Sequence, residues 1–168
     1  FLYPLGDYVP IGGMKCKVSS WRRIDDNAVP SRGKIVGSYV NSAFAKTEAL
    51  ACGFDEAIVL DQEGHAVEGS AENLFIVRDG ALITPPVSDN ILEGITRSTL
   101  ITVARDEGIP VIERSIDRTE LYYADEVLLT GTGARVSPVI QIDQYSVGTG
   151  AIGPVSKKLQ RMYMDIVR

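Results

Sequence analysis

Two clusters of charged residues have types and spacing that could support chemistry. The first is Gly33-Lys34, with Tyr39 five positions after the lysine. A lysine in a loop is usually a solvated surface charge, but a lysine withdrawn from water can form Schiff bases with carbonyl compounds. The second cluster is Glu68 and Glu72, which precede an apolar segment. Two carboxylates at this spacing form either a solvated turn or an acid–base pair, and the spacing leaves both open.

A third cluster consists of two turns rich in glycine and threonine. The segment LEGIT ends at Thr96 and leads into an expected helix, and the segment LTGTGA contains Thr132. The N-terminus of a helix attracts anions through its free backbone N–H groups, and glycines let such groups converge on an anion. Neither turn matches a nucleotide-binding pattern, since G-K-[ST] is absent and G-T-G lacks its third glycine. The turns favour a phosphate site over ATP or NAD binding, with ordinary turns as the alternative.

The composition argues against several other kinds of site. Among 168 residues there are one histidine, His65, and two cysteines, Cys16 and Cys52, which are too few for a tetrahedral zinc site. One histidine without G-x-S-x-G gives little support to a Ser–His–Asp hydrolase. Two cysteines without C-x-x-C spacing indicate buried, reduced thiols in a cytosolic protein. The net charge of -5 argues against non-specific nucleic-acid binding, and no segment is apolar for the length of a membrane span.

The elements that position these clusters are strands and helices in mixed order, which predicts an α+β fold. Asp79-Gly80 between two apolar segments predicts a hairpin, because the type I′ turn requires positive φ at both positions. Asp117 and Glu120 have the spacing of a capping box. Hydrophobic patterns predict helices over 37–51, 95–108 and 154–168, and strands over 15–24, 56–61, 73–78, 81–84, 111–115, 126–130 and 136–143.

The start of the chain has a different composition. Residues 1–13 hold three glycines and two prolines, which is typical of a linker. The sequence opens at Phe1 without an initiator Met, so we expect it to begin partway through a longer chain. Residues 14–168 are long enough to form one domain with its own core.

Five segments, in this order, closely resemble the C-terminal, cofactor-binding part of the branched-chain amino acid aminotransferases. This family belongs to the class IV, or D-amino-acid-aminotransferase-like, pyridoxal-phosphate enzymes. The resemblance extends from about Gly13 to Arg168, and the form EGSAENLF favours the branched-chain enzymes over D-amino acid aminotransferases and aminodeoxychorismate lyases. The segments are GKIVGSYVNSAFAKTEA, VEGSAENLFIVRDG, ITPPVSDNILEGITR, LYYADEVLLTGTGARVSPV and GPVSKKLQ.

The resemblance implies a mixed-sheet pseudo-barrel flanked by helices, with pyridoxal 5′-phosphate (PLP) as cofactor. Lys34 would be linked covalently to the cofactor and would move the substrate's Cα proton. Tyr39 would hydrogen-bond the phenolic oxygen of the cofactor, and Glu68 would hold its pyridine nitrogen protonated. The remaining roles implied are Leu92 against the ring face, Ile95, Thr96 and Thr132 at the phosphate, backbone N–H groups of Gly133 and Ala134 at the substrate carboxylate, and Glu72 as a support for neighbouring side chains.

The implied reaction is ping-pong transamination of leucine, isoleucine or valine with 2-oxoglutarate, in a cytoplasmic homodimer or larger homo-oligomer that needs no metal, nucleic acid or membrane. The family also has a smaller N-terminal domain, which this sequence does not supply. We therefore expect residues 1–13 to be an interdomain linker and residues 14–168 to be the PLP-binding domain. The alternative is an isolated PLP-binding fragment with little or no turnover. Gly133 and Arg135 differ from the residues common in the family and could alter the acceptor range.

Overall fold

The computed structural model describes residues 9–10 and 12–167, so most of the expected linker over 1–13 lies outside the described residues. Short 3₁₀ helices occupy Ser31–Gly33, Val36–Ser38, Val87–Asp89 and Arg118–Tyr122. The other elements are β1 (Met14–Arg22), α1 (Tyr39–Ala51), β2 (Glu56–Leu60), β3 (Ala66–Gly69), β4 (Asn73–Arg78), β5 (Ala81–Thr84), α2 (Ile95–Asp106), β6 (Val111–Glu113), β7 (Glu126–Gly131), β8 (Arg135–Ile142), β9 (Tyr145–Ser146) and α3 (Pro154–Val167).

The strands of the described residues form one mixed sheet that closes on itself. Its order is β3-β2-β1-β8-β7-β4-β5-β6, and β3 also pairs with β4, so that six of the strands complete a ring. The closing pair is a single antiparallel register match, Glu68 with Asn73. β1 is parallel to both β2 and β8, whereas β7 is antiparallel to β4 and β8. The predicted α+β mixed-sheet pseudo-barrel is confirmed.

Alternation along the strands sends side chains to two sides of the sheet, as the pleat requires. On β4, Leu74 and Ile76 join one buried cluster, while Phe75 and Val77 join another that includes residues of α2 and α3. The first cluster also contains side chains from β1, β2, β7 and β8, and is therefore the interior of the barrel. The apolar strand patterns in the sequence correspond to these two cores.

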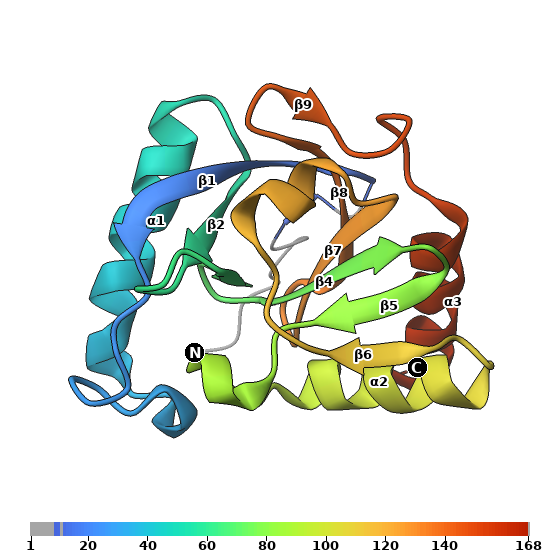
Figure 1. Ribbon diagram of the computed structural model, residues 1–168, viewed down its shortest axis with the longest axis horizontal. Helices are drawn as coiled ribbons and strands as arrows, with labels where there is room; N and C mark the ends of the chain where they lie inside the picture. Colours follow the sequence, from blue (N-terminus) through green and yellow to red (C-terminus); the bar gives the residue numbers. More distant parts are fainter. Residues whose placement is uncertain (1–8, 11, 168) are drawn as a thin grey trace, which may run out of the picture.

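Helices cover the barrel from different sides (Figure 1). α1 packs on β1 and β2, with Ala45 and Ala49 fully buried against this part of the sheet. α2 and α3 pack against each other and against β7. The outward face of α1 and the segment before it expose the apolar side chains of Val36, Val40 and Phe44. None of the helices within the described residues combines the length and the apolar character needed to cross a membrane.

The local turn signals are largely confirmed. Asp79 and Gly80 have φ of 50° and 75°, as a type I′ hairpin between β4 and β5 requires. Gly53 and Gly108 follow α1 and α2 with φ of 82° and 72°, which is the left-handed conformation that ends many helices. Pro154 is the first residue of α3. β3 and β9 were not predicted as strands.

The predicted capping box is wrong. Asp117 precedes a short 3₁₀ helix and makes no side-chain capping bond to the residues described. The Glu120 carboxylate instead accepts hydrogen bonds from Arg114 and Arg78, with an Nη1–Oε1 distance of 3.1 Å for Arg78. Bonds from arginine to a carboxylate are stronger than bonds from a neutral backbone amide, so the carboxylate turns away from the helix end.

The prediction of two buried thiols is half right. Cys16 is completely buried in the barrel interior, whereas Cys52 is exposed. Cys52 is the C-cap residue directly after α1. The chain changes direction at Gly53, which has a positive φ, and leaves the Cys52 side chain exposed.

Candidate active site

Lys34 lies in the short connection between two 3₁₀ helices that leads into α1. Its φ and ψ are both 45°, in the left-handed region. This conformation costs a non-glycine residue about 1 kcal/mol or more, and such strain is concentrated at functional sites. The side chain is exposed and lines two adjoining cavities.

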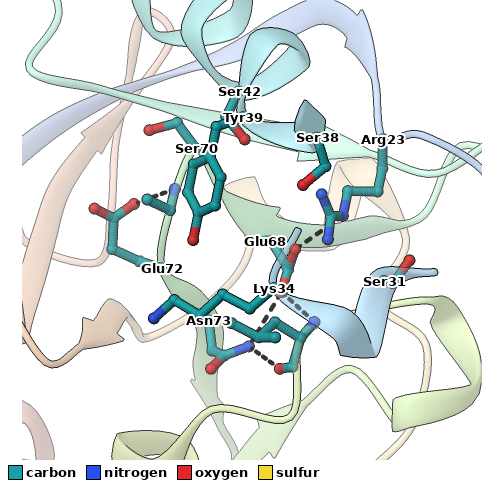
Figure 2. A pocket seen from close by; sticks show the side chains of 12 residues that line it. Arg23, Ser31, Lys34, Ser38, Tyr39, Ser42, Glu68, Ser70, Glu72 and Asn73 are labelled. Atoms are coloured by element: carbon teal, nitrogen blue, oxygen red, sulfur yellow. Dashed lines mark hydrogen bonds and ion pairs between the residues drawn. The ribbon is translucent and has the colours of Figure 1, made fainter. Parts of the chain in front are cut away.

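The first cavity, of about 40 Å³, brings together residues from separate parts of the chain (Figure 2). Lys34 comes from the connection before α1, and Tyr39 is the first residue of α1. Glu68 is on β3, and Glu72 is in the turn between β3 and β4. The structure therefore gathers these four predicted residues around one space, which is lined by Arg23, Ser31, Lys34, Ser38, Tyr39, Ser42, Glu68, Ser70, Ala71, Glu72, Asn73 and Leu92.

The second cavity, of about 280 Å³, shares Lys34 and Leu92 with the first and extends to both glycine–threonine turns. Its wall includes Ile95, Thr96 and Thr132, so the structure brings the predicted phosphate-binding residues to the same space as Lys34. The cavity is lined by Arg32, Lys34, Ala71, Asn73, Leu92, Glu93, Gly94, Ile95, Thr96, Thr130, Gly131 and Thr132.

The start of α2 on this cavity is suited to an anion. Gly94 is the N-cap residue, and no side chain among the described residues caps the helix there. The first amides of a helix have no acceptor inside it, and the helix dipole adds partial positive charge. The Thr130 hydroxyl is buried without a hydrogen-bond partner in the described part of the chain. The Thr96 hydroxyl lies 3.4 Å from that of Tyr163, so it also contacts α3.

Gly133 and Ala134 lie in the turn between β7 and β8, directly after Thr132. Gly133 is exposed and Ala134 is buried, and both are beyond the residues that line the two cavities. Their predicted contact with a substrate carboxylate stays a prediction.

Glu68 is buried, accepts two hydrogen bonds and lies beside one arginine. Its Oε1 accepts the backbone N–H of Leu92 at 2.7 Å and the side-chain amide of Asn73 at 3.2 Å. Its Oε2 lies 3.0 Å from Nε of Arg23. Burial raises the pKa of Glu68 to about 7, against the opposing effects of the Arg23 charge, the Leu92 hydrogen bond and the Arg97 charge. A solvated turn is therefore excluded for this carboxylate.

Glu72 is buried in a different environment. Oε2 accepts the backbone N–H of Ala71 at 3.0 Å, and Oε1 has no hydrogen-bond partner among the residues described. Burial and, next, the nearby Glu56 carboxylate raise the pKa of Glu72 to about 7, while Lys46 opposes the shift. The Nζ atom of Lys46 lies 2.5 Å from Oε2 of Glu56. Two carboxylates of perturbed pKa on one cavity are able to hold or release protons near neutral pH.

Arg23 and Asn73 are site residues that the sequence did not reveal. Arg23 follows directly after β1, at the end of a predicted strand, and Asn73 opens β4. The available signal for Arg23 was a charge close to the end of a buried strand. For Asn73 it was a polar residue between Glu72 and a run of apolar residues.

The arrangement offers complementary groups for one ligand with three features. Lys34 supplies an amine for a carbonyl carbon, the start of α2 receives an anion, and Glu68 offers a buried carboxylate to a ring nitrogen. These groups surround adjoining spaces, so a single molecule can contact all of them.

Comparison with known proteins places this geometry in a family. The family model described as amino-transferase class IV matches residues 2–142. A "Probable branched-chain-amino-acid aminotransferase" of Aquifex aeolicus is 54% identical, over 100% of this chain and 55% of the relative. The chain thus spans about half the length of the curated relatives it matches.

Solved structures agree with this match. The branched-chain aminotransferase of Thermoproteus uzoniensis with norvaline is 48% identical with a TM-score of 0.94, over 98% of this chain and 55% of that one. The T.th. branched-chain aminotransferase complexed with N-(5′-phosphopyridoxyl)-L-glutamate is 46% identical with a TM-score of 0.90, over 94% and 52% of the two chains. Fold, site and sequence lead to one conclusion: the chain belongs to the class IV aminotransferases.

Proposed function

We propose that this chain forms the PLP-binding part of a branched-chain aminotransferase, which transfers the amino group of leucine, isoleucine or valine to 2-oxoglutarate. The observation that carries the proposal is the meeting of Lys34, the buried Glu68 and the uncapped start of α2 around two adjoining cavities. The ligand of the T.th. relative joins a phosphopyridoxyl group to glutamate, the amino acid that 2-oxoglutarate would become.

The residues present fit PLP. Free amides at the start of α2 and the unpartnered Thr130 hydroxyl suit its phosphate. Glu68, buried and beside Arg23, suits the pyridine nitrogen. When bound, PLP supplies an electron-accepting ring and a carbon that carries the amino group between substrates.

Lys34 and Glu68 do the proton chemistry in this proposal. The Nζ of Lys34 would hold the cofactor covalently until the amino group of the substrate displaces it, and the freed amine would then take the proton from Cα of the amino acid. Glu68 keeps a proton on the ring nitrogen, and the Arg23 charge favours the ionised carboxylate that this task requires. We assign Glu72 a supporting role, because its carboxylate is buried beside Glu56.

The other assigned residues bind and orient. Tyr39 would donate a hydrogen bond from its hydroxyl to the phenolic oxygen of the cofactor, and Leu92 would pack on the ring face. The phosphate is bound by the backbone of Ile95 and Thr96 and by Thr132, and the substrate carboxylate is bound by the amides of Gly133 and Ala134.

We further propose that residues 14–168 are one domain of a larger cytoplasmic enzyme, with residues 1–13 as the linker to a smaller N-terminal domain. The chain spans about half the length of its relatives, which supports this division. The exposed apolar side chains of Val36, Val40 and Phe44 form a face suited to a second domain or to the partner in a homodimer.

Lys34→Ala tests the cofactor assignment directly. After incubation with PLP and reduction with borohydride, peptide mass spectrometry of the unsubstituted chain is expected to locate a phosphopyridoxyl group on Lys34. Lys34→Ala is expected to lose this group, whereas Lys157→Ala, at an exposed lysine of α3, keeps it. Labelling of Lys34→Ala to the same extent would refute the assignment.

The alternative, a PLP-binding fragment with little turnover, is tested by glutamate formation from leucine and 2-oxoglutarate. We expect this chain alone to be impaired beside a version extended at its N-terminus with the missing domain. Equal rates for both would contradict the proposed division of the site between two domains.

A further inference from the structure

Asn73 lies where three parts of the site meet. It is the first residue of β4, paired with Glu68 on β3 and with Thr130 on β7. The Glu68 pair closes the barrel, and the Thr130 pair leads directly to Gly131 and the second glycine–threonine turn. Asn73 is 5% exposed, so its side-chain amide must find partners inside the protein.

The side chain closes a ring of three hydrogen bonds (Figure 2). The Asn73 amide donates to Oε1 of Glu68 at 3.2 Å and to the carbonyl oxygen of Leu92 at 2.8 Å. The backbone N–H of Leu92 donates to the same Glu68 oxygen at 2.7 Å. The ring therefore fastens the Glu68 carboxylate to the segment that leads into α2.

The other side of the amide contacts the N-cap of α2. A Cβ placed on Gly94 would overlap the Oδ1 atom of Asn73, at a separation shorter than any van der Waals contact allows. Gly94 is thus glycine because Asn73 occupies the space of a side chain. The amide contacts both the carboxylate at one end of the site and the helix start at the other.

We propose that Asn73 is a positioning residue that sets the distance between the Glu68 carboxylate and the first turn of α2. This inference rests on the proposed function in one respect: a ligand that carries both a ring nitrogen and a phosphate, as PLP does, is held at both ends at once only if that distance is fixed. A ligand that lacks the phosphate needs only the Glu68 end and gains less from Asn73.

The first test needs no ligand. In Asn73→Ala the Leu92 N–H is expected to exchange with solvent about tenfold faster or more, measured by NMR relative to amides of β7, because its acceptor is no longer held. Asn41→Ala is the matched control, since Asn41 on α1 also donates its amide to a backbone carbonyl, that of Arg22, outside the ring. An unchanged Leu92 exchange rate in Asn73→Ala would overturn the proposal.

The second test compares two ligands. The ratio of dissociation constants for pyridoxal and PLP, from fluorescence titration, measures what the phosphate adds to affinity. Asn73→Ala is expected to lower this ratio about tenfold, while a variant that is merely less folded weakens both ligands equally and leaves the ratio unchanged. An unchanged ratio would also overturn the proposal.

Gly94→Ala gives an independent variant if Asn73→Ala folds poorly, because it displaces the Asn73 amide without removing it. The same fall in the ratio is expected, and its absence would count against the positioning role. If the unsubstituted chain binds neither pyridoxal nor PLP, the proposed function fails, and the Leu92 exchange rate alone decides the role of Asn73.

Discussion

Glu68 and Glu72 lie on the same short segment, are both buried and both have a pKa raised to about 7, yet their surroundings are opposite. Glu68 faces Arg23 and accepts two hydrogen bonds, one from a backbone amide and one from Asn73. Glu72 is beside another carboxylate, Glu56, and leaves one oxygen without a partner in the described residues.

The difference shows how one turn creates two kinds of carboxylate. Burial is the largest cause of the raised pKa in both cases, and the nearest charged neighbours act in opposite directions: Arg23 lowers the pKa of Glu68, whereas Glu56 raises that of Glu72. The Arg23 charge and the Leu92 hydrogen bond favour the ionised form of Glu68, which the proposed contact with a cationic ring nitrogen requires. The carboxylate beside Glu72 favours its protonated form, which suits an uncharged structural role.

The largest expected effect separates the two carboxylates by rate. Glu68→Gln removes the carboxylate charge that we propose lies opposite the ring nitrogen, and conversion of bound PLP to pyridoxamine phosphate by L-leucine is expected to slow roughly 10²–10³-fold. Glu72→Gln, an uncharged analogue of the protonated form, is expected to remain within about tenfold of the unsubstituted chain. Stopped-flow absorbance measures both rates. An equal decrease in rate for Glu68→Gln and Glu72→Gln would contradict the different roles proposed for the two carboxylates.

A second effect is on stability. The folded state raises the pKa of Glu72 from 4.5 to about 7. The contribution of this group to the free energy of unfolding is therefore complete below pH 4.5 and is lost as the pH rises through 7. Glu72→Gln is therefore expected to raise the free energy of unfolding at pH 8, with little change at pH 4.

Urea unfolding at the two pH values provides the measurement. Glu68→Gln is expected to gain less at pH 8, because it leaves the Arg23 charge buried without its counter-ion. A gain for Glu68→Gln equal to that of Glu72→Gln would mean that Arg23 does not distinguish the two sites.

The smallest effect is on the pKa of Glu68 itself. Arg23→Met removes the charge that opposes burial, so the pKa of Glu68 is expected to rise above 7 by about one unit or more. Arg22→Met, at the exposed neighbour, should leave this pKa unchanged. Carboxyl ¹³C NMR titration reports both variants, and a Glu68 pKa that stays at about 7 in Arg23→Met would contradict the assigned role of the arginine.

Much of the fold could be predicted from local patterns. The hairpin was placed at the correct residues, since Asp79-Gly80 fixes the turn and apolar residues fill both β4 and β5. β3 was missed because Ala66–Gly69 has two apolar residues, a glutamate and a glycine, and no alternation that marks a strand. Its pairing with β2 and β4, which lies outside the segment itself, makes it a strand.

The site residues also fall into those that the sequence indicated and those that it did not. Motif resemblance located Lys34, Glu68 and Glu72, and the structure brings them to one cavity. The motifs assigned no role to Arg23 or Asn73, because their contacts with the Glu68 carboxylate form only in the folded chain. A residue whose role is to contact and orient another side chain is not marked by a motif in the sequence.

The barrel closes through the single pair of Glu68 and Asn73, and this same pair borders the candidate active site. This pair is the shortest join in the ring, and a turn of residues 70–72 connects its two strands. A ligand that contacts both Glu68 and the start of α2 would connect β3 with the segment that leads into α2. Ligand binding and the stability of the barrel are then thermodynamically linked. A rise in free ligand concentration above the dissociation constant is expected to slow protease cleavage in the β3–β4 turn.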